Sequence, residues 1–202
     1  MRVFELLSAS TERRLELVMR KCWTIGLFVT LNMWASLSIA QPATPDNSVA
    51  YAGYELERNA MWSLGTWATT NVAAGAIGLA STDDPKWRAI HQMNLGWNLV
   101  NLALAGYSLA TIQRDVQSPW HAYRRSQRLE NMLLINTGLD VAYIVAGAWL
   151  CKRGVDTGNP VDHGWGQALV LQGVALLLFD AIVAWRQAQI TDDTARALRG
   201  SL

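Results

Sequence analysis

The chain has 202 residues, which suits a single domain, and its 17 lysine and arginine side chains nearly balance 16 aspartate and glutamate side chains. This balance leaves no electrostatic footprint for a nucleic acid or an acidic substrate, so neither partner is expected. The charged residues fall in short stretches and leave four long intervals almost bare. Such a distribution is typical of a membrane protein.

Cysteine and histidine are sparse. Of the two cysteines, Cys22 lies in a segment predicted to be removed and Cys151 remains, so we expect no disulfide in the mature chain. The three histidines, His91, His121 and His163, have no partner at metal-ligand spacing. The sequence therefore predicts no metal, no cofactor and no catalytic constellation.

Residues 1–40 are predicted to form an N-terminal extension and an export signal. Within them, Met19–Ala40 combine a basic start, an apolar run and small residues before Gln41, which is the anatomy of a cleavable signal peptide. Met1–Val18 is too long for the charged region of such a signal, which favours Met19 as the natural start. The alternative is an uncleaved anchor helix over Cys22–Ala40.

Four helices are predicted after a linker at 41–54. They cover about 55–80, 85–113, 119–151 and 160–189. Each contains about 21 to 25 residues almost free of charge, enough at about 1.5 Å per residue to cross a hydrocarbon layer of about 30 Å. The predicted fold class is all-α, a four-helix transmembrane bundle over residues 55–189, with a polar C-terminal tail over 190–202.

Tryptophans lie within a few residues of the ends of these intervals: Trp62, Trp87, Trp149, Trp165 and Trp185. Membrane–water interfaces favour tryptophan at such positions. The alternative, a water-soluble four-helix bundle, needs a polar face on every helix, and the outer faces here consist of Leu, Val, Ala, Ile and Met. We expect a location in a bacterial inner membrane, with the lipid bilayer as a partner.

The orientation of the bundle is left open by the sequence. A cleaved signal places the mature N-terminus outside, and with it the arginine-rich stretch 114–128 and the C-terminal tail. The positive-inside rule favours the reverse, with 83–88 and 152–162 outside. The two signals contradict each other, so both orientations remain possible at this point.

Polar residues recur on one face of each predicted span, because their spacing is three, four, seven or eight residues. They are expected to face one another, since a polar group facing lipid has no hydrogen-bond partner. The predicted polar core comprises Asn71 on the first span, His91, Asn94, Asn98 and Asn101 on the second, Asn136, Asp140 and Tyr143 on the third, and Gln172 and Asp180 on the fourth.

Asp140 and Asp180 are the residues of this core with the clearest chemical potential. No lysine or arginine lies within the predicted spans to neutralise them. We expect one or both to hold a proton at neutral pH, because burial and a like neighbour disfavour the ionised form. Such a pair could pass protons or bind a cation, or it could serve only as hydrogen-bond glue. For His91, too, both a functional and a structural role are open.

Two further patterns stand beside the polar core. Arg124, Arg125 and Arg128 begin the third helix and could bind lipid phosphate, or they could form a solvated anchor at the membrane surface. Glycines on the spans are expected to permit close helix packing. These are Gly65, Gly75, Gly78, Gly106, Gly138, Gly147 and Gly173.

Four segments carry a resemblance to a known family: LGTWATTNVAAGAIG at 64–78, HQMNLGWNLVNLALAG at 91–106, NTGLDVAYIVAG at 136–147 and GQALVLQGVALLLFD at 166–180. In its HQMN, GLD and QG…FD pattern the chain resembles a family of uncharacterised bacterial membrane proteins, mainly from Bacteroidetes, with an export signal and four helices. The resemblance covers about residues 56–187. It implies this architecture and supplies no activity.

Three functions follow from the sequence, in order of preference. The first is a non-enzymatic membrane protein whose polar core binds or conducts a proton or small cation through Asp140, Asp180 and His91. The second is a structural or accessory subunit of a membrane complex, with other membrane proteins or further copies of the chain as partners. The third is an intramembrane metal-dependent enzyme, which ranks last because the sequence contains no recognisable nucleophile–base pair.

Overall fold

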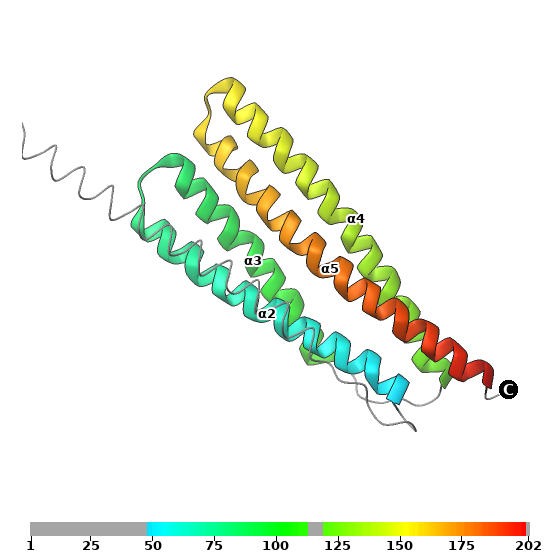
Figure 1. Cartoon of the computed structure of the whole chain (residues 1–202). Helices are drawn as coiled ribbons and strands as arrows, with labels where there is room; N and C mark the ends of the chain where they lie inside the picture. Colours follow the sequence, from blue (N-terminus) through cyan, green and yellow to red (C-terminus); the bar gives the residue numbers. More distant parts are fainter. Residues whose placement is uncertain (1–47, 113–118, 201–202) are drawn as a thin grey trace, which may run out of the picture.

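A computed structural model describes residues 48–112 and 119–200, and this part of the chain forms four helices and no strand. The helices are α2 (Ser48–Ser81), α3 (Pro85–Thr111), α4 (Pro119–Thr157) and α5 (Pro160–Gly200). They run side by side in alternating directions (Figure 1). The prediction of an all-α fold with four helices is confirmed. The predicted signal peptide and anchor helix lie outside the described residues.

Local sequence signals set the helix boundaries. The last three helices all begin at a proline, whose missing N–H costs nothing in a first turn. Asp84 caps α3 by accepting hydrogen bonds from the backbone N–H groups of Lys86 and Trp87, both at 3.0 Å. Asn159 accepts from Val161 N–H at 2.9 Å before α5, directly after Gly158, whose φ of 65° ends the preceding helix.

Two boundaries differ from the prediction. Helix α2 begins at Ser48, so residues 48–54 of the predicted linker are helical, and α5 continues to Gly200 through most of the predicted polar tail. Both helices are longer than predicted because α2, α4 and α5 continue to pack against one another beyond the end of α3. A Cβ on Gly53 would lie 3.7 Å from Ser126 Oγ and 3.8 Å from Ile190 Cγ2, so α2, α4 and α5 meet there.

We call this region the three-helix extension, and it comprises residues 48–60, 119–131 and 187–200. Leu56 and Ala60 are buried in it together with polar side chains of α5, including Gln187 and Thr194. Charged residues of both signs lie on all three segments. The extension therefore has the polar exterior of an ordinary water-exposed helix bundle.

Glycines bring α4 and α5 unusually close together. Gly147 and Gly154 on α4, and Gly166 and Gly173 on α5, are each seven residues apart and face the partner helix. A Cβ on Gly166 would lie 2.4 Å from the backbone nitrogen of Cys151, which leaves no room for any side chain. The predicted packing role is confirmed for Gly147 and Gly173, and Gly154 and Gly166, which were not predicted, share it.

The predicted packing role holds on α2 as well, and it fails at two positions. A Cβ on Gly75 would lie 3.1 Å from Leu95 of α3, and Gly78 lies directly under the ring of His91. Gly65 makes ordinary contact with Ala105 at 3.6 Å. A Cβ on Gly106 or Gly138 would meet nothing within 4 Å among the described residues, so the prediction is wrong for these two. Both lie on outer helix faces.

Polar and apolar side chains share the interior of the bundle. Asparagine, glutamine and aspartate side chains are buried between the helices beside an apolar core that includes Trp67, Phe179 and Val183, and large apolar side chains are also exposed along the outer faces. On α4 the exposed large apolar side chains are Trp120, Met132, Leu134, Ile135, Leu139, Val141, Val145, Trp149 and Val155. Single exposed apolar residues are common in any protein, whereas buried polar groups together with a large exposed apolar surface call for an explanation.

Two helices of the described part, α4 and α5, are long and apolar enough to cross a membrane. Helices α2 and α3 were expected to qualify as well and do not. Their composition explains the difference, because Ser, Thr and Asn replace aliphatic residues at many positions, as in the segment TWATTN at 66–71. Some of these polar residues face inward and others, such as Thr66 and Thr69, are exposed, and both kinds lower the mean hydropathy of the two helices.

Exposed and half-buried tryptophans mark two levels of the bundle. Contacts of Gly164 with Lys86 and of Gly166 with Cys151 place Trp165 near the ends of α3 and α4 that carry Trp87 and Trp149. Trp185 lies twenty residues further along α5, and Trp62 of α2 lies toward this second level. At about 1.5 Å per residue, the two levels are about 30 Å apart.

Candidate functional site

Asn94 of α3 is the centre of a hydrogen-bond network between three helices. Its side-chain nitrogen donates to the backbone oxygen of Asn71 on α2 at 3.0 Å. Its side-chain oxygen accepts from Gln172 Nε2 of α5 at 2.5 Å and from Asn98 Nδ2 at 3.2 Å. Asn71 thus joins the network through its backbone, while its own amide donates to Trp67 O within α2.

Asp140 of α4 and Asp180 of α5 form a carboxyl pair. The two residues are 3% and 8% exposed, and their carboxyl groups are close enough to influence each other. Two such groups are unlike an ordinary surface pair, because ionising both would bring like charges together away from water. Ionising either group places a negative charge in the interior of the bundle.

This charge has no basic neighbour at its level of the bundle. The helix segments between the two tryptophan levels, 63–80, 89–107, 133–148 and 166–184, contain no lysine or arginine. Asp140 is nine residues from Trp149 and Asp180 is five from Trp185, about 14 Å and 8 Å along the helix axis. The pair lies near the middle of the interval, displaced toward the three-helix extension.

Five polar atoms of this interior have no hydrogen-bond partner among the described residues. Asn98, Asn101, Asp140 and Gln172 are all less than a tenth exposed. The unpaired atoms are Trp97 Nε1, Asn98 Oδ1, Asn101 Nδ2, Asp140 Oδ2 and Gln172 Oε1. Native interiors contain few such atoms, and each calls for an explanation.

Sequence reasoning missed Trp97, which lies half-buried on α3. Its indole is packed edge-on against Tyr143 of α4, with ring centroids 4.6 Å apart. This contact places Tyr143 beside Trp97. The spacing could have revealed Trp97, because it is the residue before Asn98 and three after Asn94.

Two predicted core residues lie elsewhere. Asn136 is exposed, because α4 buries only a narrow stripe against α5 through Leu133, Asp140 and Gly147. His91 is half-buried at the α2–α3 contact, where its ring covers Gly78 and lies 6.4 Å from the ring of Trp87. His91 lies on the same helix face as Asn94, and it is one turn further from the carboxyl pair than Asn94 is.

The three arginines at the start of α4 do not act as one cluster. Arg125 forms an ion pair with Glu57 of α2 at 2.8 Å, which ties the three-helix extension together. Arg124 lies over the ring of Trp120 at 5.1 Å. Arg125 is thus paired with a carboxylate, whereas Arg124 and Arg128 are exposed at the surface, and a phosphate site at the three arginines stays a prediction.

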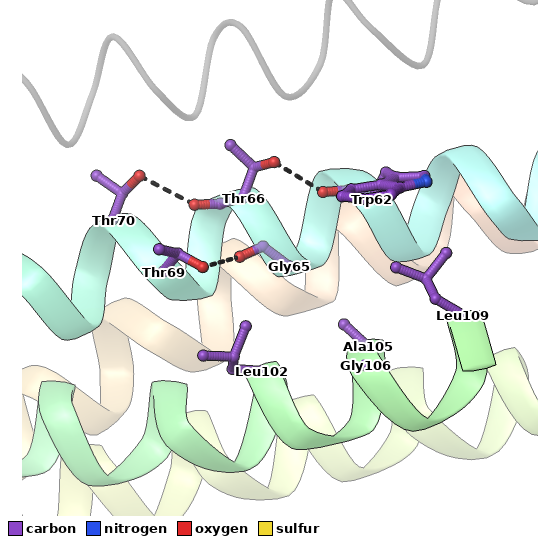
Figure 2. Close-up of a pocket in the computed structure, with 9 residues that line it drawn as sticks. All are labelled: Trp62, Gly65, Thr66, Thr69, Thr70, Leu102, Ala105, Gly106 and Leu109. Carbon is purple, nitrogen blue, oxygen red and sulfur yellow. Dashed lines mark hydrogen bonds between the residues drawn. The ribbon is translucent and has the colours of Figure 1, made fainter.

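A shallow groove of about 390 Å³ runs between α2 and α3 on the outer surface (Figure 2). The hydroxyl groups of Thr66, Thr69 and Thr70 donate to backbone oxygens of α2 itself, as drawn in Figure 2, so the groove is apolar in character. Trp62 and Gly106 also line it. Separately, residues 48–112 and 119–200 contain no group of three or more His, Cys, Asp or Glu side chains that could hold a metal ion.

The fold and site define a class: an all-α protein of four long helices with some polar side chains buried between them. Within that class, the chain belongs to the Family of unknown function (DUF6992), which matches residues 63–181. No curated protein and no solved structure matches the chain. An uncharacterised family was predicted from the four sequence segments and is confirmed; its bacterial, Bacteroidetes-type origin stays a prediction.

The family match coincides with the interval between the two tryptophan levels. It begins at Ser63, one residue after Trp62, and ends one residue after Asp180. It contains the carboxyl pair, the Asn94 network and all five unpaired atoms of the interior. Most of the three-helix extension lies outside it, apart from the first turns of α4.

Proposed function

We propose that this protein is an integral membrane protein whose four helices span the bilayer between the two tryptophan levels. Three features support this. The outer faces at this height are apolar, the tryptophan levels are about one hydrocarbon thickness apart, and two helices are apolar enough to cross a membrane. The charged three-helix extension then lies in water on one side.

Within this membrane protein, we propose that the interior binds protons and passes them between the two sides. The observation that carries the proposal is the adjacent, buried pair of Asp140 and Asp180. A carboxylate at this depth costs several kcal/mol, so intramembrane acids usually mark a proton or ion pathway or a paired structural network. Such a pair can accept a proton from one side and release it to the other.

The amide network supplies the rest of the path. Asn94, Asn98 and Gln172 carry polar atoms from the carboxyl pair toward the end of the bundle at which His91 lies. Hydrogen-bonded amides and bound water can relay a proton over such a distance where apolar side chains cannot. On the other side, Asp180 lies only about 8 Å from the level of Trp185.

The test is proton flux in proteoliposomes that contain the full chain and an internal pH-sensitive dye. We expect Asp140→Asn and Asp180→Asn to lower flux by about 100-fold, because each removes an essential proton carrier. Asp156→Asn is the matched control, since Asp156 is an exposed carboxylate near the end of α4. Thermal unfolding of each purified variant shows whether the fold is retained.

Unchanged flux in both folded variants would refute proton transfer. The carboxyl pair would then be a structural contact between α4 and α5, and its loss would alter only the unfolding temperature.

An accessory subunit of a membrane complex is the second candidate, favoured by the apolar groove between α2 and α3. A transmembrane helix of a partner could lie against its small residues, as small side chains permit close helix approach. Mild-detergent extraction should then recover a partner at fixed stoichiometry, and Gly106→Leu should release it. A chain that is isolated alone in both forms argues against this role.

A further inference from the structure

Three of the unpaired interior atoms are oxygens, and they come from three different helices. They are Asn98 Oδ1 of α3, Asp140 Oδ2 of α4 and Gln172 Oε1 of α5. Their residues are 0%, 3% and 2% exposed. Buried acceptors without a donor are costly, and in native interiors they bind an ordered water or an ion.

The three side chains belong to one layer of the bundle. Gln172 and Asn98 both donate to the same oxygen of Asn94, which brings their amide groups together. A Cβ on Gly173, the residue after Gln172, would lie 3.2 Å from the backbone oxygen of Asp140. Because α3 and α5 run in the same direction and Gln172 contacts Asn94, Asn98 lies close to residue 176 of α5. The layer is therefore about 6 Å thick.

From this layer we infer a binding site for a small monovalent cation, Na⁺, with Asn98 Oδ1, Asp140 Oδ2 and Gln172 Oε1 as its protein ligands. Hard cations take carboxylate, amide and water oxygens. An ionised Asp140 favours a cation over water alone, because an uncompensated charge in a buried site is strongly unfavourable. The inference rests on the proposed proton-binding pair and adds a second occupant to it.

Two unpaired donors complete the site. Trp97 Nε1 and Asn101 Nδ2 lie within about one helical turn of Asn98 along α3 and cannot themselves bind a cation. Each can donate to a water whose other lone pair contacts Na⁺. A partly hydrated ion held by three protein oxygens satisfies all five unpaired atoms at once.

The test is equilibrium binding of ²²Na⁺ to the purified full chain in detergent micelles. We expect saturable binding. Asn98→Leu should lower the affinity about 10- to 100-fold, the usual effect of losing one group of a metal site. Gln172→Glu, which keeps an oxygen at its position, should retain binding. Asn136→Leu is the control on an exposed asparagine.

A second measurement keeps the inference testable if Asn98→Leu does not fold. The unfolding temperature of the unmodified chain should rise with NaCl and not with choline chloride at equal ionic strength, since a ligand that binds only the folded state stabilises it. The absence of both saturable ²²Na⁺ binding and this rise overturns the sodium site. If Asp140→Asn still abolishes proton flux in that case, the proposed proton function stands and only the cation site is wrong.

Discussion

Replacing Gly166 by alanine tests whether the α4–α5 seam holds the two helices together. The new Cβ would lie 2.4 Å from the backbone nitrogen of Cys151 and 2.7 Å from the backbone oxygen of Gly147, and ordinary contact begins at 3.4 Å. Both neighbours are backbone atoms, so no side-chain rotation relieves the clash. Helix α4 must move outward by about 1 Å, and overpacking of this kind costs about 1–3 kcal/mol.

Gly138→Ala on α4 is the matched control, because a Cβ there meets nothing within 4 Å among the described residues. Alanine has the higher helix propensity, so this variant should be more stable by up to about 1 kcal/mol. Thermal unfolding in detergent should therefore show a lower unfolding temperature for Gly166→Ala and a higher one for Gly138→Ala. A change of 1 kcal/mol corresponds to about 2–4 °C for a domain of this size. Equal effects at the two positions would refute the close packing of α4 on α5.

Two further substitutions test the ends of the bundle by the same unfolding measurement. Glu57→Gln breaks the half-buried ion pair with Arg125 and should lower the free energy of unfolding by about 1–2 kcal/mol. Glu55→Gln, at an exposed pair, should change it by less than about 0.5 kcal/mol. Similar values for the two variants would show that the α2–α4 pair contributes no more than a surface contact. Asp84→Ala removes the cap of α3 and should cost about 1 kcal/mol, and Asp84→Asn should restore most of it; a loss in both variants alike would contradict the capping role.

Much of the architecture follows from local sequence. Three prolines and the capping residue Asp84 predicted where helices begin, since their effect depends only on the backbone of one turn. The three- and four-residue spacing of Asn94, Asn98 and Asn101 predicted a polar face that the structure buries in part or in full. The helix starts and the polar face do not depend on how the helices pack, because they are properties of single helices.

The site itself depends on how faces are matched between helices, and periodicity leaves this open. Asn136 lies four residues before Asp140, and only the narrow contact of α4 with α5 exposes the one and buries the other. Likewise, only the tertiary structure shows that the indole nitrogen of Trp97 has no hydrogen-bond partner among the described residues. Arg125 belonged to a basic cluster in sequence until α2 placed Glu57 beside it.

The composition and spacing of the chain thus determined four helices with largely apolar outer faces and polar residues on their inner faces. The tertiary structure decided that Asp140 lies beside Asp180 with no lysine or arginine at that depth, and that unpaired oxygens of α3, α4 and α5 are buried. The physical reason is distance. A helix periodicity places a side chain on a face, while the approach of α4 to α5 at their glycines sets which atoms of the two faces come within bonding range.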